Sequence, residues 1–284
     1  EEEPLKEKPQ DPFWPPMKRV FLMLLSTMLG LAIGLLGGAL IGGLAGLVTW
    51  LIAGKETAII VAVGLGGVLA MAMAVVISVW AGATTGIGRE DARNHPSFIW
   101  WIVNRLFFLA AITSLQRFAL YFFMYSFNID VEAATSLFGN LISLVGVFTL
   151  VSAFVGGWLA DRFSHKLLVG LSGIMAAFGC TLLLGTILVP SEVLIFIAGI
   201  VLGSATGVFM TTNWAMGTNL APAARAGFFL GISNLAGAGA GIIGGSIGGP
   251  VADYLNLSNP GLGYFVIFAG YAVLFALSAV SLRY

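Results

Sequence analysis

Gln116 and Arg117 lie near the middle of a long apolar run, residues 98–127. If this run crosses a membrane as a helix, an arginine at its centre costs roughly 2.5–3.5 kcal/mol, so the side chain needs a partner or a water-filled cavity. One interpretation is a contact between Arg117 and an anionic or polyhydroxylated substrate. The other is a pair with a neighbouring helix, or with free carbonyls at a kink. The sequence leaves both interpretations open.

Two tyrosines continue the helix face of Arg117, because Tyr121 and Tyr125 follow it at the i+4 and i+8 positions. They could line the same cavity, although aromatic packing is the favoured interpretation for each alone. Gln116 instead shares a face with Arg105, since their separation nearly completes three helical turns.

A second polar cluster, residues 211–219, ends another apolar run. Within it, Asn213 and Trp214 are candidates for the same substrate cavity. The favoured alternative for Asn213 and Asn219 is capping of the helix end before Pro222.

A six-residue pattern ends two apolar runs: residues 156–161 read GGWLAD and residues 248–253 read GGPVAD. The first copy continues through Arg162 to Lys166. A carboxylate such as Asp161 at a helix end can pair with an arginine or a helix N-terminus, and such a contact can break when two domains rock. We therefore define a candidate conformational latch at Asp161 and Arg162. The alternative is ordinary topogenic and capping charge.

The composition indicates a polytopic membrane protein, since 58% of the residues are hydrophobic and only 9% are charged. The single cysteine, Cys180, excludes an internal disulfide. His95 and His165 lie in loops without metal-ligand neighbours, and neither a nucleophile–base pair nor a phosphate-binding loop is found. We expect no enzymatic activity, cofactor, metal or nucleic-acid partner.

Runs of about 20 apolar residues predict eight transmembrane helices, at residues 20–53, 58–81, 98–127, 134–160, 167–189, 193–215, 228–251 and 264–282. Most basic residues near the ends of these spans fall on one side, and Lys55 alone falls on the other; the larger group is Lys18, Arg19, Arg89, Arg93, Arg162, Lys166, Arg225 and Arg283. The positive-inside rule then places both ends of the chain in the cytoplasm. We expect a multi-pass protein of the plasma (inner) membrane.

The string from Gly157 through Asp161 and Arg162 to Lys166 resembles the loop motif of the major facilitator superfamily, although Ser164 and His165 replace its usual glycine and arginine. This resemblance implies that the candidate latch consists of Gly157, Asp161, Arg162 and Lys166. The resemblance covers residues 98–282 and implies a six-helix half built as an inverted three-plus-three repeat. Residues 211–219 look like the tenth-helix end of cation-linked sugar-type facilitators, where acidic residues are frequent in place of Asn213 and Asn219. A carboxylate that couples transport to an ion is therefore not expected in these spans.

The remaining segments divide the chain into a disordered cytoplasmic linker at 1–17, a two-helix transmembrane hairpin at 18–88, a cytoplasmic loop at 89–96 and the transporter domain at 97–284. Small residues recur every fourth position in both hairpin helices, a glycine zipper that lets helix backbones approach closely; they are Ser26, Gly30, Gly34, Gly38, Gly42 and Gly46, then Ala58, Ala62, Gly66, Ala70, Ala74, Ser78, Gly82 and Gly86. Packing of the hairpin on itself is the favoured interpretation. The alternative is docking to the transporter body or to another membrane partner.

The sequence therefore favours half of a secondary active or facilitative transporter, which moves a small solute by alternating access. Its expected partners are the lipid bilayer, an unidentified small-molecule substrate and a missing N-terminal six-helix half, in the same polypeptide or a separate chain. The alternative is a transport-inactive scaffold or assembly subunit of a larger membrane complex that binds pigment or lipid.

Overall fold

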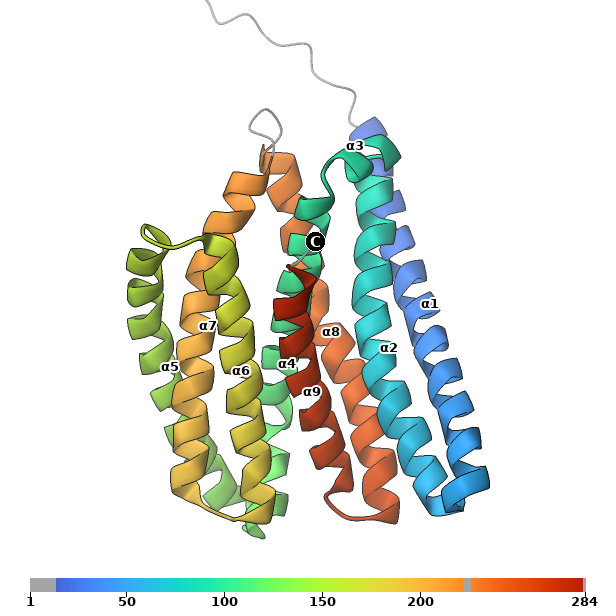
Figure 1. Ribbon diagram of the computed structural model, residues 1–284, viewed down its shortest axis with the longest axis vertical. Coiled ribbons are helices and arrows are strands. Elements are labelled where there is room, and N and C mark those ends of the chain that lie inside the picture. The colour runs from blue at the N-terminus through green and yellow to red at the C-terminus, as the bar shows by residue number, and fades with distance from the viewer. Residues whose placement is uncertain (1–13, 222–225, 283–284) are drawn as a thin grey trace, which may run out of the picture.

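The computed structural model describes residues 14–221 and 226–282, and every regular element in these ranges is a helix (Figure 1). The helices are α1 (Trp14–Ala53), α2 (Lys55–Gly86), α3 (Arg89–Asn94), α4 (Pro96–Phe127), α5 (Val131–Ala160), α6 (His165–Leu188), α7 (Glu192–Leu220), α8 (Ala226–Ser258) and α9 (Leu262–Ser281). Within the described ranges, eight of them are long and apolar enough to cross a membrane. This confirms the predicted all-helical polytopic class.

Helices α1 and α2 form an antiparallel hairpin through the predicted stripes of small residues. A Cβ added at Gly38 would lie 2.3 Å from the Cα of Ala70, and one at Gly34 would lie 2.4 Å from the Cα of Ala74. The backbones approach this closely only because side chains are absent there. Packing of the hairpin on itself is thus confirmed.

A different face of α2 packs on the six-helix body, so the hairpin also docks to the transporter body, while a further membrane partner at the hairpin stays a prediction. Gly67 contacts Val251 of α8, Gly64 contacts Val266 of α9, and Gly270 of α9 faces Val68. The ring of Trp80 meets that of Trp100 edge to face, with centroids 6.2 Å apart. The hairpin is therefore held against α4, α8 and α9 by contacts between helices as well as by its connection through α3.

Helix α4 is the central helix of the body, whereas α5 is peripheral. In their most apolar windows, 83% of α4 is buried but only 6% of α5. Stacked aromatic rings fix α4 against its neighbours: Phe108 lies 3.7 Å from Phe209 of α7, and Phe122 lies 4.6 Å from Phe268 of α9, between ring centroids. These contacts stabilise the middle of α4 and its end distant from α3.

Helices α5 and α7 run parallel and in close contact. A Cβ at Gly203 would lie 2.6 Å from the carbonyl oxygen of Val145, and one at Gly207 would lie 2.2 Å from that of Thr149. The Thr149 hydroxyl also donates to the carbonyl of Gly203 at 3.1 Å. The backbones are therefore held together as one unit.

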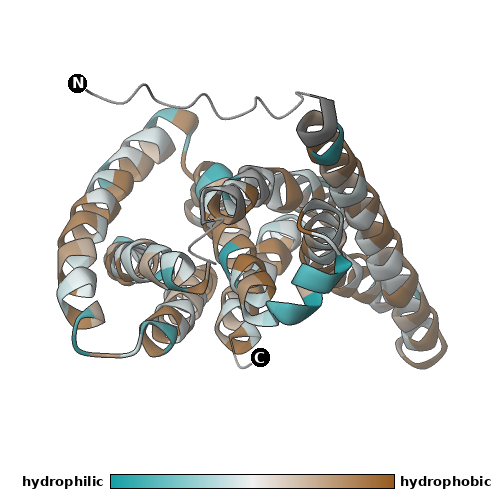
Figure 2. Ribbon diagram, turned by 90° about the horizontal axis from the view of Figure 1, so that it is seen from above, coloured by the Kyte–Doolittle hydropathy of each residue, from teal (hydrophilic) through white to brown (hydrophobic). Residues whose placement is uncertain are grey.

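Charged and apolar residues separate along the long axis. Seen from the end that carries α3, the hydrophilic residues gather in α3 and at helix ends, while the long helices are mostly apolar (Figure 2). The α5–α6 connection lies at this same end, which we call the α3 end (Figure 1). Among the described basic residues, Lys18, Arg19, Arg89, Arg93, Arg162 and Lys166 belong to helix ends and connections on this side, whereas Arg225 and Arg283 lie outside the described residues.

Three boundaries differ from the sequence prediction. Residues 89–94 of the expected loop form the short helix α3, and α1 begins at Trp14, inside the expected linker; the rest of that linker, residues 1–13, lies outside the described residues. Helix α8 continues past Pro250 to Ser258. Proline costs a helix one backbone hydrogen bond but does not always end it, since neighbouring helices can support the distorted turn. The GGWLAD copy nevertheless lies at the α3 end, and the GGPVAD copy lies toward the opposite end of α8.

Candidate functional site

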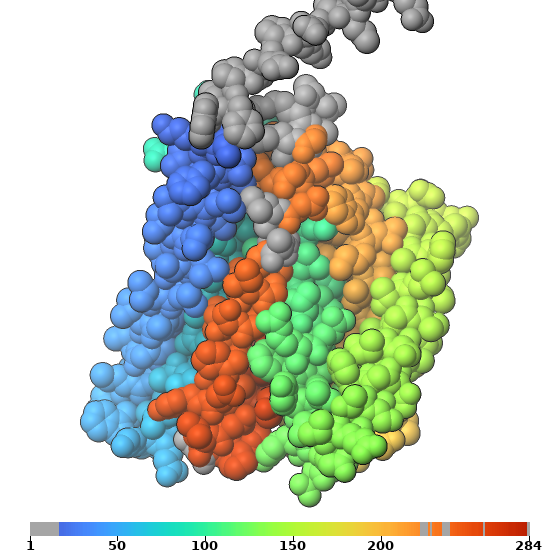
Figure 3. All heavy atoms as spheres, turned by 180° about the vertical axis from the view of Figure 1, so that it is seen from behind, coloured from blue at the N-terminus to red at the C-terminus, as the bar shows by residue number. Residues whose placement is uncertain are grey.

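The outer part of α4, distant from α3, has one uncovered face. The ten residues of α4 from Phe98 onward, at the end near α3, are nearly all buried. In the outer part of the helix, exposed residues recur with a spacing of three or four. Figure 3 shows this part of α4 between α8 and α5. We call it the open face of α4, and its exposed side chains are Thr113, Gln116, Arg117, Tyr121 and Tyr125. Four predicted cavity residues are thus exposed along the outer part of α4. Arg117, Tyr121 and Tyr125 share its α8 side, whereas Gln116 lies about 100° round from Arg117.

Arg117 lies across a glycine-lined part of α8. A Cβ at Gly245 would come within 2.5 Å of Nη1 of Arg117, and one at Gly241 would lie 3.9 Å from Nη2. The glycines leave room for the guanidinium group against the backbone of α8. Arg117 is exposed and makes no ion pair with any described residue, so the predicted alternative of an interhelix pair finds no carboxylate partner within the described part.

The two tyrosines behave differently. The hydroxyl of Tyr125 donates to the carbonyl of Pro260, and its ring packs beside Tyr264, with ring centroids 6.2 Å apart. Tyr125 thus stabilises the α8–α9 connection. Tyr121 is 53% exposed and has no such contact with the described residues.

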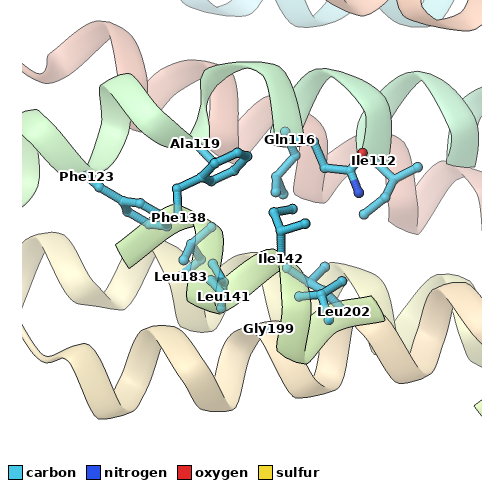
Figure 4. A pocket seen from close by; sticks show the side chains of 12 residues that line it. Ile112, Gln116, Ala119, Phe123, Phe138, Leu141, Ile142, Leu183, Gly199 and Leu202 are labelled. Atoms are coloured by element: carbon cyan, nitrogen blue, oxygen red, sulfur yellow. The ribbon is translucent and has the colours of Figure 1, made fainter. Parts of the chain in front are cut away.

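Gln116 borders a small apolar crevice among α4, α5, α6 and α7 (Figure 4). The crevice encloses about 30 Å³. A site for an organic solute needs roughly 300–1,000 Å³. The crevice is thus a packing gap beside the open face, and a solute-sized cavity requires a second wall facing α4.

Asn213 and Trp214 of α7 do not lie beside Arg117. They lie at the level of Arg105, which is about 18 Å from Arg117 along α4, toward the α3 end. Nη1 of Arg105 donates to Oδ1 of Asn213 at 3.0 Å, and the guanidinium carbon lies 4.3 Å from the centre of a Trp214 ring. The side chain of Asn213 is fully buried. Its interpretation as a helix cap is therefore wrong. Asn219 is exposed and makes no hydrogen bond with the described residues.

A buried polar network extends from this pair to α9. Nδ2 of Asn213 donates to Oδ1 of Asn104 at 2.9 Å. Nδ2 of Asn104 donates to the carbonyl and the hydroxyl of Ser278, each at 2.8 Å. Asn104 and Arg105 were not among the predicted site residues. Their adjacent polar side chains, inside an otherwise apolar run, were the signal that could have identified them.

The candidate latch lies at the α3 end, between α5 and α6. Asp161 follows the last residue of α5, and the guanidinium of Arg162 lies over the Trp158 ring at 4.2 Å. Asp161 and Lys166 are exposed, and Asp161 makes no ion pair with a described residue. Gly157 has only an ordinary contact with Thr211, whereas its neighbour Gly156 packs tightly on Val208. The described residues thus provide no charged partner for Asp161, and the latch stays a prediction.

Metal-binding geometry is not found in the described ranges, where no three His, Cys, Asp or Glu side chains converge. The fold and the site together define a polytopic helical membrane protein, whose central helix presents a charged and polar face beside apolar helices.

Comparison with protein families agrees with this class. The model of the Major Facilitator Superfamily matches residues 106–284. The chain belongs to this superfamily and is a transporter of that kind. No curated protein matches the chain.

Proposed function

We propose that the protein moves a small polar solute across the membrane by alternating access, and that the open face of α4 lines the solute path. A second six-helix half, in the same polypeptide or a separate chain, would supply the opposite wall. Substrates and coupling ions of secondary transporters typically bind near the midplane, between structural repeats. The resemblance to cation-linked sugar-type facilitators places polyhydroxylated solutes among the candidates.

The observation that carries this proposal is the exposed guanidinium group of Arg117 on a membrane-spanning helix. Facing lipid, it would cost several kcal/mol, whereas facing water or a polar solute it would not. Its neighbours on the open face, Thr113 and Gln116, are also polar, while the exposed side chains of α1 are predominantly large and apolar. This contrast supports an aqueous cavity on α4 and a lipid contact on α1.

The proposal also assigns an orientation. The basic residues of the α3 end favour a cytoplasmic location for that end, in the plasma (inner) membrane. The latch residues Gly157, Asp161, Arg162 and Lys166 would then lie at the cytoplasmic mouth, where Asp161 would bind the other half in one state and release it in the other.

Substitution of Arg117 tests its role as a solute contact. Thermal stabilisation of the full-length protein in detergent by sugars, organic anions and lipids identifies a binding compound. Arg117→Lys keeps the charge but loses the planar fork of donors, so affinity for that compound should fall about tenfold or more while stability is retained. Arg19→Lys, the same change on the exposed part of α1, is the control and should have no effect.

Arg117→Met separates the two interpretations left open by the sequence. If Arg117 faces a water-filled cavity, water occupies the space that its guanidinium group leaves, so the stability of the protein should change little. If Arg117→Met is strongly destabilised and Arg117→Lys binds normally, Arg117 is a structural residue and not a solute contact.

A further inference from the structure

Arg105 is a buried cation without a counter-ion in the described part of the protein. Its side chain is 7% exposed, inside a membrane-spanning helix. It forms no ion pair with a described carboxylate, and the described acidic residues all lie in the connections or within two turns of a helix end. A buried charge normally requires an opposite charge or complete hydrogen bonding.

The hydrogen bonding of Arg105 is incomplete as well. A guanidinium group carries five N–H donors. One hydrogen bond is formed, from Nη1 to Oδ1 of Asn213, and the buried Nε has no partner. The charge and the Nε–H donor thus have no partner among the described residues.

The surroundings of Arg105 are rigid and already assembled. The network through Asn104 to Ser278 fixes the amide of Asn213, so that its oxygen faces Arg105. Nε1 of Trp101 donates to the backbone carbonyl of Asn213 at 3.0 Å, and Gly217 leaves the space that the Trp101 ring occupies. Three helices therefore hold the guanidinium in place before any ligand binds, which reduces the entropy cost of binding.

Trp214 covers the guanidinium group. Its ring lies over Arg105, while Trp214 itself is only half-buried. A cation–π contact attracts a cation more weakly than a paired anion does, and an indole side chain can change rotamer. Trp214 can thus serve as a removable cover, at the edge of the site that is nearest to the surface.

We propose that Arg105 binds an oxyanion, a carboxylate or a phosphate group, and that Trp214 closes the site when the anion is absent. Arginine suits such groups because its planar fork can donate to two oxygens at once. Taking this oxyanion as part of the transported solute rests on the proposed function. The neutral Asn213 supports the proposal, since an aspartate there would neutralise Arg105 from within the protein.

Thermal unfolding of the full-length protein in detergent tests the site with sodium phosphate and with sodium acetate. Each salt is compared with sodium chloride at equal ionic strength. We expect a saturable rise in Tm with at least one of the two, since a ligand that binds only the folded state stabilises it. A response to phosphate alone indicates a phosphate-bearing solute, and a response to acetate alone indicates a carboxylate. Glucose lacks a charge, so any rise in Tm that it causes should not depend on Arg105.

Three variants assign the response to this arginine. Arg105→Met removes the charge, and Asn213→Asp places a carboxylate beside Nη1; both should abolish the rise in Tm. Arg105→Lys keeps the charge and should bind at least tenfold more weakly, which provides a result even if the neutral variant does not fold. Lys55→Gln removes an exposed charge at the tip of the hairpin and should respond as the wild type does.

The proposal is overturned if neither anion raises the Tm of the wild type, or if the rise persists in a folded Arg105→Met or Asn213→Asp variant. The first result would indicate that a carboxylate outside the described residues neutralises Arg105. Neither result affects the proposed transport function, which depends on Arg117 and the open face of α4.

Discussion

The two arginines of α4 show how the surroundings of a charged side chain determine its role. Arg117 lies against glycines of α8 and is exposed, whereas Arg105 is enclosed by Trp101, Asn213 and Trp214. On our two proposals, water and solute reach Arg117 directly, whereas a ligand reaches Arg105 only by displacing Trp214. The same residue type on one helix thus provides an exposed contact and an occluded one.

Asn213 should be far more important for stability than Asn219, although both belong to the same polar cluster. Asn213→Ala leaves the Arg105 guanidinium without its hydrogen bond and Asn104 without a donor, so we expect a loss of about 2–4 kcal/mol in the free energy of unfolding. Asn219→Ala, at an exposed position, should change it by less than about 0.5 kcal/mol. Denaturant unfolding in detergent measures both. Equal effects would contradict the observed network.

At the residue scale, the sequence predicted one half of this arrangement. The shared face of Arg117, Tyr121 and Tyr125 follows from helix periodicity, and the structure confirms that face. The contact between Arg105 and Asn213 was not predictable, because it depends on how α4 packs against α7, far away in the sequence. Periodicity defines the face of a helix but does not identify its neighbour.

At the scale of helices, glycines determine which pairs approach most closely. The regular spacing of small residues in α1 and α2 correctly predicted the hairpin. An equivalent stripe in α7, formed by Gly199, Gly203 and Gly207, packs on α5. Small residues favour close packing wherever lipid provides no hydrophobic driving force, but the pattern alone did not show that α5 is the partner of α7.

Two glycines of α1, one inside the hairpin contact and one outside it, give a matched test of the hairpin. Gly38→Ala would place a methyl group against the backbone of Ala70, which cannot move aside easily, so the free energy of unfolding should fall by about 1–3 kcal/mol. Gly43 faces open space, and Gly43→Ala should be neutral or stabilising by up to about 1 kcal/mol, because alanine favours the helix. Unfolding in detergent compares them. A larger loss at Gly43 would contradict the zipper.

At the scale of the whole molecule, the latch and the buried site are connected through one rigid pair of helices. Asp161 follows α5, and α5 packs along α7, which carries Asn213 and Trp214. A displacement of α5 at its connection to α6 would therefore also displace α7, and with it Trp214, whose ring lies over Arg105. This connection supports the proposal that the α3 end participates in the change between states.

Asp161→Asn should shift the populations of the inward-open and outward-open states while it retains the fold, because it removes charge and keeps shape. Distance measurements between labels across the two mouths of the full-length protein report the shift. Asp130→Asn is the control at the opposite end of α5, where asparagine can still cap the helix as Asp130 does through Ala133. Unchanged populations and unchanged transport in Asp161→Asn would leave it only a topogenic or capping charge.

The central claim is that the open face of α4 lines an aqueous cavity and not lipid, and cysteine accessibility tests it most directly. Tyr121 and Phe178 are almost equally exposed, at 53% and 58%, but Phe178 lies on α6, away from the open face. Each is replaced by cysteine in the full-length protein without other reactive thiols; Cys180 is fully buried and can remain. A charged, membrane-impermeant thiol reagent should label Tyr121→Cys and leave Phe178→Cys unlabelled. Equal failure to label both positions would place the open face in lipid and contradict the account.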